Sequence, residues 1–73
     1  MTNSTAKLIS ENIKKIRQEK GLTQEKLSEL CDISADYLSE IERCKKLPSL
    51  KRLILIAEKL EIPIEKLFIN SKT

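Results

Sequence analysis

The chain is short, moderately charged and free of histidine, and these properties narrow what it can be. It has 73 residues, a formal net charge of +3, 40% hydrophobic residues and no His. A chain of this length buries only about 60% of its unfolded surface. We therefore expect one domain over residues 1–73, with a folded part of about 5–69. The lack of His and of a glycine-rich phosphate loop argues against an enzyme, and we expect no catalytic residue.

The sequence also does not predict a membrane segment, a metal site or a cofactor. No apolar segment approaches the roughly 18 residues of a membrane span, and the start MTNSTAK lacks the apolar core of a signal peptide. We expect a cytoplasmic protein without a membrane partner. Two cysteines without a nearby His or a close Cys pair do not predict a zinc site or a disulfide framework. No cofactor and no small-molecule ligand are expected.

The first predicted helix carries Ile9, Ile13 and Ile16 at helical spacing. Gly21, the single glycine, ends this helix as a left-handed C-cap, and Thr23 caps the next helix. The chain therefore turns a tight corner between these two residues.

Two short helical patterns then meet across a turn of about three residues. The inward positions of the two patterns and of the turn are Leu27, Cys31, Ile33, Leu38 and Ile41. Asp32 stands at the turn, where its tolerance of left-handed backbone is useful, and Ser34 caps the second pattern. This spacing predicts a helix-turn-helix motif.

The outward face of the helix after Ser34 is where we expect DNA to be read. Its outward residues are Ala35, Asp36, Ser39, Glu40 and Arg43, with Tyr37 at the edge. Arg43 can reach a phosphate or a guanine, and Asp36 or Glu40 can accept a hydrogen bond from cytosine N4. Because carboxylates weaken attraction to a polyanion, plain solvated surface is an equal alternative for each of these side chains.

Two prolines introduce the last two predicted helices. Pro48 and Ser49 start a fourth helix, and Pro63 starts a short fifth. The fourth is expected to face the core with Leu50, Leu53, Ile54, Ala57 and Leu60, and the fifth with Ile64, Leu67 and Phe68. The sequence therefore predicts an all-α, compact bundle of five helices.

Four basic residues surround the start of the fourth helix, where the helix dipole disfavours cations. They are Lys45, Lys46, Lys51 and Arg52. A nearby DNA phosphate would explain this placement, and a solvated run of surface charge is the alternative.

An apolar surplus at the C-terminal end predicts a homodimer. In the fourth helix, Leu55 lies almost opposite the expected core stripe and should be exposed in a monomer, and Ile56 lies at the edge of that stripe. Ile62 and Ile69 add apolar residues near the short last helix. A contiguous apolar patch marks an interface. We therefore expect a homodimer joined through the fourth and fifth helices, with Leu55, Ile56, Ile62 and Ile69 at the interface, that reads a near-palindromic operator.

With Gln24 at the start of the second helix and the run YLSEIER in the third, the chain resembles the lambda-repressor-like (Cro/CI, XRE) family over about residues 9–68. The resemblance implies a sequence-specific DNA-binding transcriptional regulator. In that family, positions matching Ala35, Asp36 and Glu40 approach base edges, and those matching Gln24 and Arg43 approach phosphates. Arg17 and Glu42 match positions that form an ion pair.

Tyr37 and Lys46 match positions used in controller proteins of restriction-modification systems, which the chain also resembles in size. The candidate contacts to double-stranded DNA are Arg17, Gln24, Ser34, Ala35, Asp36, Tyr37, Ser39, Glu40, Arg43 and Lys46. Asp32 and Cys44 stand where the family usually has glycine, which predicts left-handed backbone. Cys31 is interpreted as a core residue. The alternative function is a protein-interaction module on the same fold without sequence-specific DNA binding.

Overall fold

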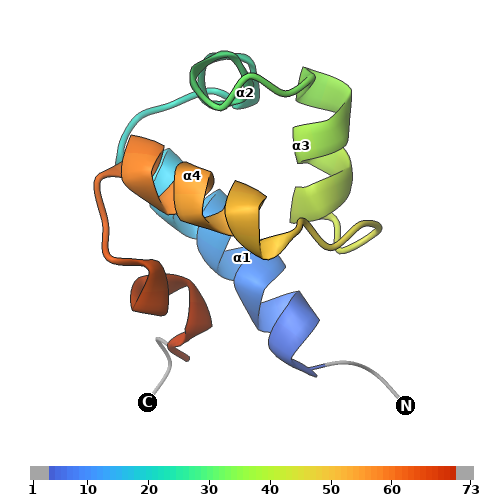
Figure 1. The fold of residues 1–73 in the computed structure, drawn as a ribbon, viewed down its shortest axis with the longest axis vertical. Helices are drawn as coiled ribbons and strands as arrows, with labels where there is room; N and C mark the ends of the chain where they lie inside the picture. Colours follow the sequence, from blue (N-terminus) through green and yellow to red (C-terminus); the bar gives the residue numbers. More distant parts are fainter. Residues whose placement is uncertain (1–3, 71–73) are drawn as a thin grey trace.

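The computed structural model describes residues 4–70, and the regular secondary structure of that range is all helical. Its elements are α1 (Ser4–Glu19), α2 (Gln24–Leu30), α3 (Ala35–Glu42), α4 (Leu50–Leu60) and a 3-10 helix, η1 (Ile64–Phe68) (Figure 1). The all-α prediction is confirmed, but the predicted fifth α-helix is this 3-10 helix. A five-residue segment is short enough for i to i+3 hydrogen bonds, as in the 3.0 Å bond from Lys66 N–H to the Pro63 carbonyl.

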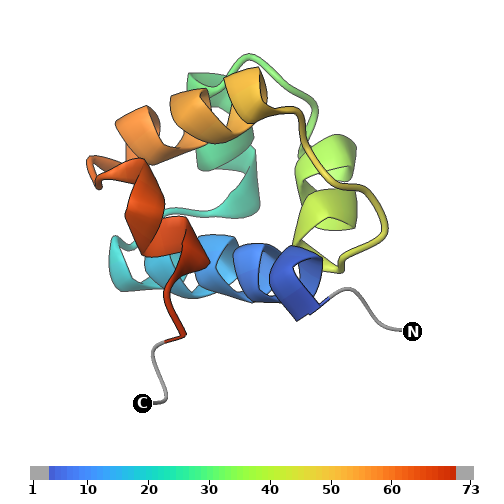
Figure 2. The same ribbon diagram turned by 60° about the horizontal axis from the view of Figure 1, so that its bottom comes forward.

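The helix-turn-helix consists of α2 and α3, which meet at an angle across a short turn (Figure 1). Both pack on a support made by α1 and α4, since α1 contacts α3 and α4 contacts α2. In Figure 2, η1 lies beside α1 after the chain has left α4, and η1 contacts both of these helices. One outer face of α3 is consequently left uncovered by the other elements.

Hydroxyl side chains cap the three inner helices as the sequence predicts. Thr23 accepts a hydrogen bond from Lys26 N–H at the start of α2, and Ser34 accepts one from Tyr37 N–H at the start of α3. At the start of α4, Ser49 Oγ accepts from Arg52 N–H at 3.3 Å. Each cap satisfies a backbone donor that has no partner within its helix.

Left-handed backbone marks the turns. Gly21 has φ +73°, and Asp32 and Cys44 have φ values of 56° and 60°, which confirms the predictions for the two non-glycine residues. Glu61 also has φ 60° and closes α4 as its C-cap. The sequence did not indicate this position, because glutamate is not a residue that favours left-handed backbone.

The core lies between α1, the helix-turn-helix and α4. Its buried apolar residues are Ile9, Ile13, Leu27, Cys31, Leu38, Ile41, Leu53, Ile56, Ala57, Leu60 and Leu67. Ile16 and Ile33 are partly buried against this core. The predicted inward faces of α1, α2 and α3 are therefore confirmed, which fixes the orientation of the motif on its support.

The predicted core stripe of α4 is confirmed for Leu53, Ala57 and Leu60, which are buried, and wrong for its other two residues. Leu50 and Ile54, expected in the core, are 64% and 44% exposed, whereas Ile56, expected at the edge, is 1% exposed. Leu55, expected to be exposed, packs partly against the core. Most residues of α4 are apolar, so its sequence contains more than one stripe with helical spacing. Phe68, also expected inside, is exposed.

A buried asparagine on α1 holds the C-terminal end of the described chain. Asn12 Nδ2 donates to the carbonyls of Leu67 and Ile69, each at 2.9 Å, and lies 3.5 Å from the Lys66 carbonyl. These bonds join segments more than 50 residues apart in the sequence. Asn12 therefore fixes η1 against α1.

Candidate nucleic-acid interface

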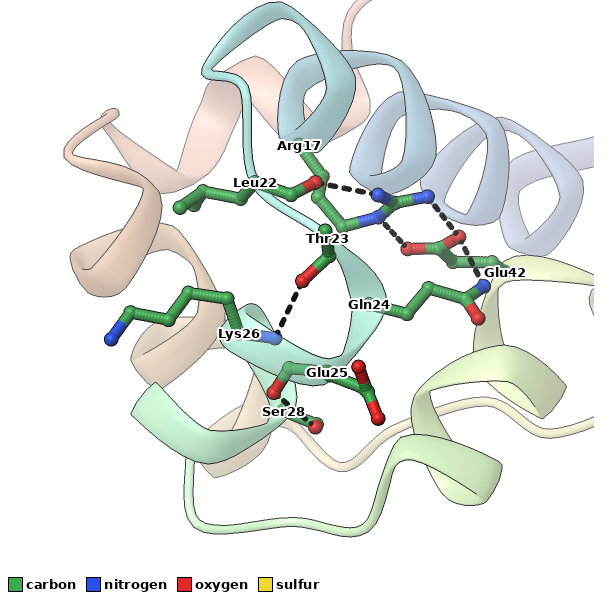
Figure 3. A network of polar contacts seen from close by, with 8 residues as sticks. All are labelled: Arg17, Leu22, Thr23, Gln24, Glu25, Lys26, Ser28 and Glu42. Carbon is green, nitrogen blue, oxygen red and sulfur yellow. Dashed lines mark hydrogen bonds and ion pairs between the residues drawn. The ribbon is translucent and has the colours of Figure 1, made fainter.

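A buried ion pair joins α1 to the end of α3. Arg17 Nε donates to Glu42 Oε2 at 2.7 Å and Arg17 Nη2 to Glu42 Oε1 at 3.1 Å (Figure 3). The two side chains are only 9% and 2% exposed. The predicted pair is therefore present, and its low exposure protects it from solvent screening.

The same pair organises the corner between α1 and α2. Arg17 Nη1 donates to the Leu22 carbonyl at 2.7 Å, so the guanidinium is directed into the protein. We therefore assign Arg17 to this structural pair and remove it from the candidate DNA contacts. Gln24 Nε2 donates to Glu42 Oε1 at 2.9 Å, which places the start of α2 beside the end of α3 (Figure 3).

The candidate residues on α3 lie at or near the surface. Asp36 and Arg43 are exposed, while Ala35, Ser39 and Glu40 are partly exposed. Ser34 is exposed as well, and its hydroxyl is the α3 cap. The structure thus brings these predicted residues together on one outer surface, with Gln24 at one side of it.

The charge of Glu40 is partly compensated by a lysine. Lys46 Nζ lies 3.7 Å from Glu40 Oε1, and both side chains remain accessible to water. An exposed pair of this kind adds about 1 kcal/mol at most to stability. Its effect on the local charge is more important, because Lys46 offsets one of the two carboxylates, Asp36 and Glu40, on the outward face of α3.

Tyr37 forms the other side of this surface. The Arg52 guanidinium carbon lies 5.3 Å from the Tyr37 ring centroid, and Lys46 Nζ lies 6.0 Å from it. Sequence reasoning placed Arg52 only in a general basic cluster and not among the DNA contacts. Fourteen residues lie between Tyr37 and Arg52, and no periodic pattern links α3 to α4, so the sequence does not reveal the contact.

Cys31 and Cys44 are both free thiols and occupy different environments. Cys31 is buried, and that burial raises the pKa of its thiol despite an opposing effect of Lys59. A raised pKa keeps the thiol protonated and unreactive, consistent with the interpretation of Cys31 as a core residue. Cys44 is exposed at the end of α3.

Residues 4–70 contain no cluster of three or more His, Cys, Asp or Glu side chains able to hold a metal ion. Within the same range, the helices are too short or too polar to cross a membrane.

Comparison with known proteins gives the family. Residues 13–67 match the family HTH_3, described as helix-turn-helix. An uncharacterized HTH-type transcriptional regulator of Sinorhizobium fredii is 38% identical over 56 residues, which are 77% of this chain and 73% of that protein. The immunity repressor protein of Bacillus phage phi105 is 41% identical over 56 residues, which are 77% of this chain and 39% of that protein.

A solved structure agrees with this assignment. The wild-type restriction-modification controller protein C.Esp1396I is 37% identical, with a TM-score of 0.83 over 92% of this chain and 87% of that one. These matches confirm the resemblance to XRE-type regulators and to controller proteins that the helix-turn-helix segment indicates. The chain therefore belongs to the helix-turn-helix family of transcriptional regulators.

Proposed function

We propose that the protein is a sequence-specific DNA-binding transcriptional regulator that reads a near-palindromic operator as a homodimer. The observation that carries this proposal is the outer surface of α3, which is exposed and polar while the opposite face holds the core. An α-helix fits the major groove, where base edges present distinct donors and acceptors. Asp36, Glu40 and Arg43 supply the matching acceptors and donors.

The composition of this surface suits selectivity more than raw affinity. The net charge is only +3, and two carboxylates, Asp36 and Glu40, lie on the outward face of the reading helix. Carboxylates accept hydrogen bonds from cytosine N4 and repel phosphates. A protein with this surface should have low affinity for DNA of arbitrary sequence, because phosphate attraction is weak. Its preference for one sequence then depends on the base contacts.

Variants of the two kinds of residue are expected to separate in a selection from randomised duplex DNA. Gln24→Ala and Lys46→Ala should weaken binding to all sequences about equally, because phosphate contacts position the protein. Asp36→Ala and Glu40→Ala should change the preferred bases, each altering discrimination by about 1–3 kcal/mol per base pair. Thermal unfolding of each variant controls for loss of fold. An unchanged consensus for both carboxylate variants would contradict base reading through α3.

The homodimer is proposed on a surface that differs from the one the sequence predicted. Ile56 is buried within the chain and cannot contact a second copy, and Leu55 and Ile62 are partly buried against the core. Of the predicted dimerisation residues, Ile69 is exposed. The exposed side of α4 instead presents Leu50 and Ile54, one helical turn apart. We therefore keep α4 in the proposed dimer interface but assign the contact to these two residues.

Ile54→Lys is expected to raise the dissociation constant of the dimer by roughly tenfold or more, because it places an unpaired charge in an apolar contact. The same variant should weaken operator binding and leave the folded monomer intact. Leu30→Lys is the matched control, since Leu30 is an exposed leucine on α2 rather than on α4. Sedimentation that finds the unmutated protein monomeric at high micromolar concentration contradicts the dimer.

A protein-interaction module on the same fold is the second candidate. The acidic pair Asp36 and Glu40 on the exposed face of α3 favours it, since both repel a polyanion. Binding to duplex DNA without any sequence preference, so that the selection recovers no consensus, would support this candidate over the regulator.

A further inference from the structure

We propose that Tyr37 positions Arg52 to contact a DNA phosphate on the side of α3 opposite Gln24. This inference rests on the proposed DNA-binding function and adds a residue to that site. Arg52 lies in the first turn of α4, with its guanidinium carbon 5.3 Å from the Tyr37 ring centroid. A cation at this distance from an aromatic ring is attracted by the negative face of the ring.

Helix geometry places the two contacts on opposite sides of the reading helix. Tyr37 and Glu42 are five residues apart on α3, which corresponds to about 140° around a helix of 3.6 residues per turn. Glu42 binds Gln24, and Tyr37 contacts Arg52. The 140° arc between them holds the buried residues Leu38 and Ile41. The outward residues of α3 occupy the remaining arc of about 220°, so Tyr37 and Glu42 mark its two edges. A helix in the major groove has a phosphate backbone on each side, so Gln24 and Arg52 are placed to meet one backbone each.

The charge of Arg52 is available to a ligand. No acidic side chain among residues 4–70 forms an ion pair with it, and the side chain is exposed. Lys46 also lies near the Tyr37 ring, but its ammonium group is paired with Glu40. A guanidinium held near an aromatic ring by its charge keeps its N–H groups available, and these groups match phosphate oxygens bidentately.

The surface beside Arg52 is recessed and not flat. Asp32, Ile33, Ser34, Tyr37 and Arg52 line a hollow of about 430 Å³ between the turn of the motif and α4. Asp32 makes the far rim acidic, which disfavours an anion deep in the hollow. The favoured position for a phosphate is therefore on the Arg52 and Lys46 side, next to α3.

Titrations against duplex DNA at several salt concentrations test this contact. The probes are a 30-base-pair duplex of mixed sequence and a duplex enriched by the unmutated protein from a randomised library. Arg52→Ala should weaken binding to both duplexes by about tenfold and reduce the slope of log affinity against log salt by about 0.9. Lys51→Ala is the matched control, because Lys51 is the neighbouring exposed cation and has no contact with the Tyr37 ring. It should have a clearly smaller effect on both quantities.

The positioning role of Tyr37 is tested by coupling to Arg52. Tyr37→Leu should weaken DNA binding in the unmutated background and have little further effect in Arg52→Ala, whereas Tyr37→Phe should retain binding because it keeps the ring. Equal losses for Tyr37→Phe and Tyr37→Leu, or additive effects with Arg52→Ala, would overturn the positioning role.

Two outcomes separate this inference from the function on which it rests. If the unmutated protein selects a consensus but Arg52→Ala behaves like Lys51→Ala, the Arg52 contact is wrong and the proposed function stands. If the unmutated protein binds neither duplex, both are wrong.

Discussion

Glu42→Ala is expected to lower the free energy of unfolding by about 3 kcal/mol. The change leaves the buried Arg17 guanidinium with only the Leu22 carbonyl as a partner and deprives Gln24 of its acceptor. A buried charge without its partner is far more costly than the net stabilisation of the intact pair. Urea unfolding followed by circular dichroism measures the effect.

A double-mutant cycle separates the pair from its surroundings. Arg17→Met combined with Glu42→Leu should cost less than the sum of the two single changes, because neither charge then remains buried alone. The control is the exposed pair Lys26 and Glu29, whose charged atoms are 3.6 Å apart on the surface of α2. Removing either member should change stability by at most about 0.5 kcal/mol. Additive effects at Arg17 and Glu42 would contradict the buried pair.

Asn12→Leu is expected to lower the free energy of unfolding by about 2–3 kcal/mol. It removes the donor that the Leu67 and Ile69 carbonyls share, and the buried Leu67 carbonyl has no route to water while η1 stays in place. The variant should also loosen η1 from α1, which increases amide hydrogen exchange near residues 64–69.

Gln18→Leu controls for the loss of an amide on the same helix, since Gln18 is exposed. Its effect should stay within about 0.5 kcal/mol. Equal destabilisation by the two changes, or unaltered exchange near η1 in Asn12→Leu, would show that Asn12 does not hold the C-terminal segment.

The motif could be predicted from the sequence because its signals are local. Thr23 and Ser34 start helices by capping a donor three residues away, and Asp32 closes the turn within the same short segment. The inward residues of α1 to α3 recur every three or four positions with mostly polar residues between them, so the sequence indicates a single buried face for each helix. The pair between Arg17 and Glu42 was accessible only through the resemblance to a known family, since 25 residues separate its members.

The remaining features depend on tertiary contacts that no local pattern encodes. The buried face of α4 was mispredicted in part because several stripes of this apolar helix have helical spacing, and packing against α2 and η1 selects among them. Ile56, one of the predicted dimerisation residues, is buried within the chain for the same reason. Nothing in the sequence around Asn12 indicates that it is buried, because its partners are carbonyls of the C-terminal segment more than 50 residues away. Arg52 and Tyr37 meet only because α3 and α4 start near each other in space.

Selection of duplex DNA from a fully randomised library by the unmutated protein tests the central claim most directly. The account predicts one enriched near-palindrome with half-site centres about 10 base pairs apart, bound by two chains per duplex. Recovered pools without a consensus, from a protein that is folded by circular dichroism, would contradict sequence-specific reading by α3.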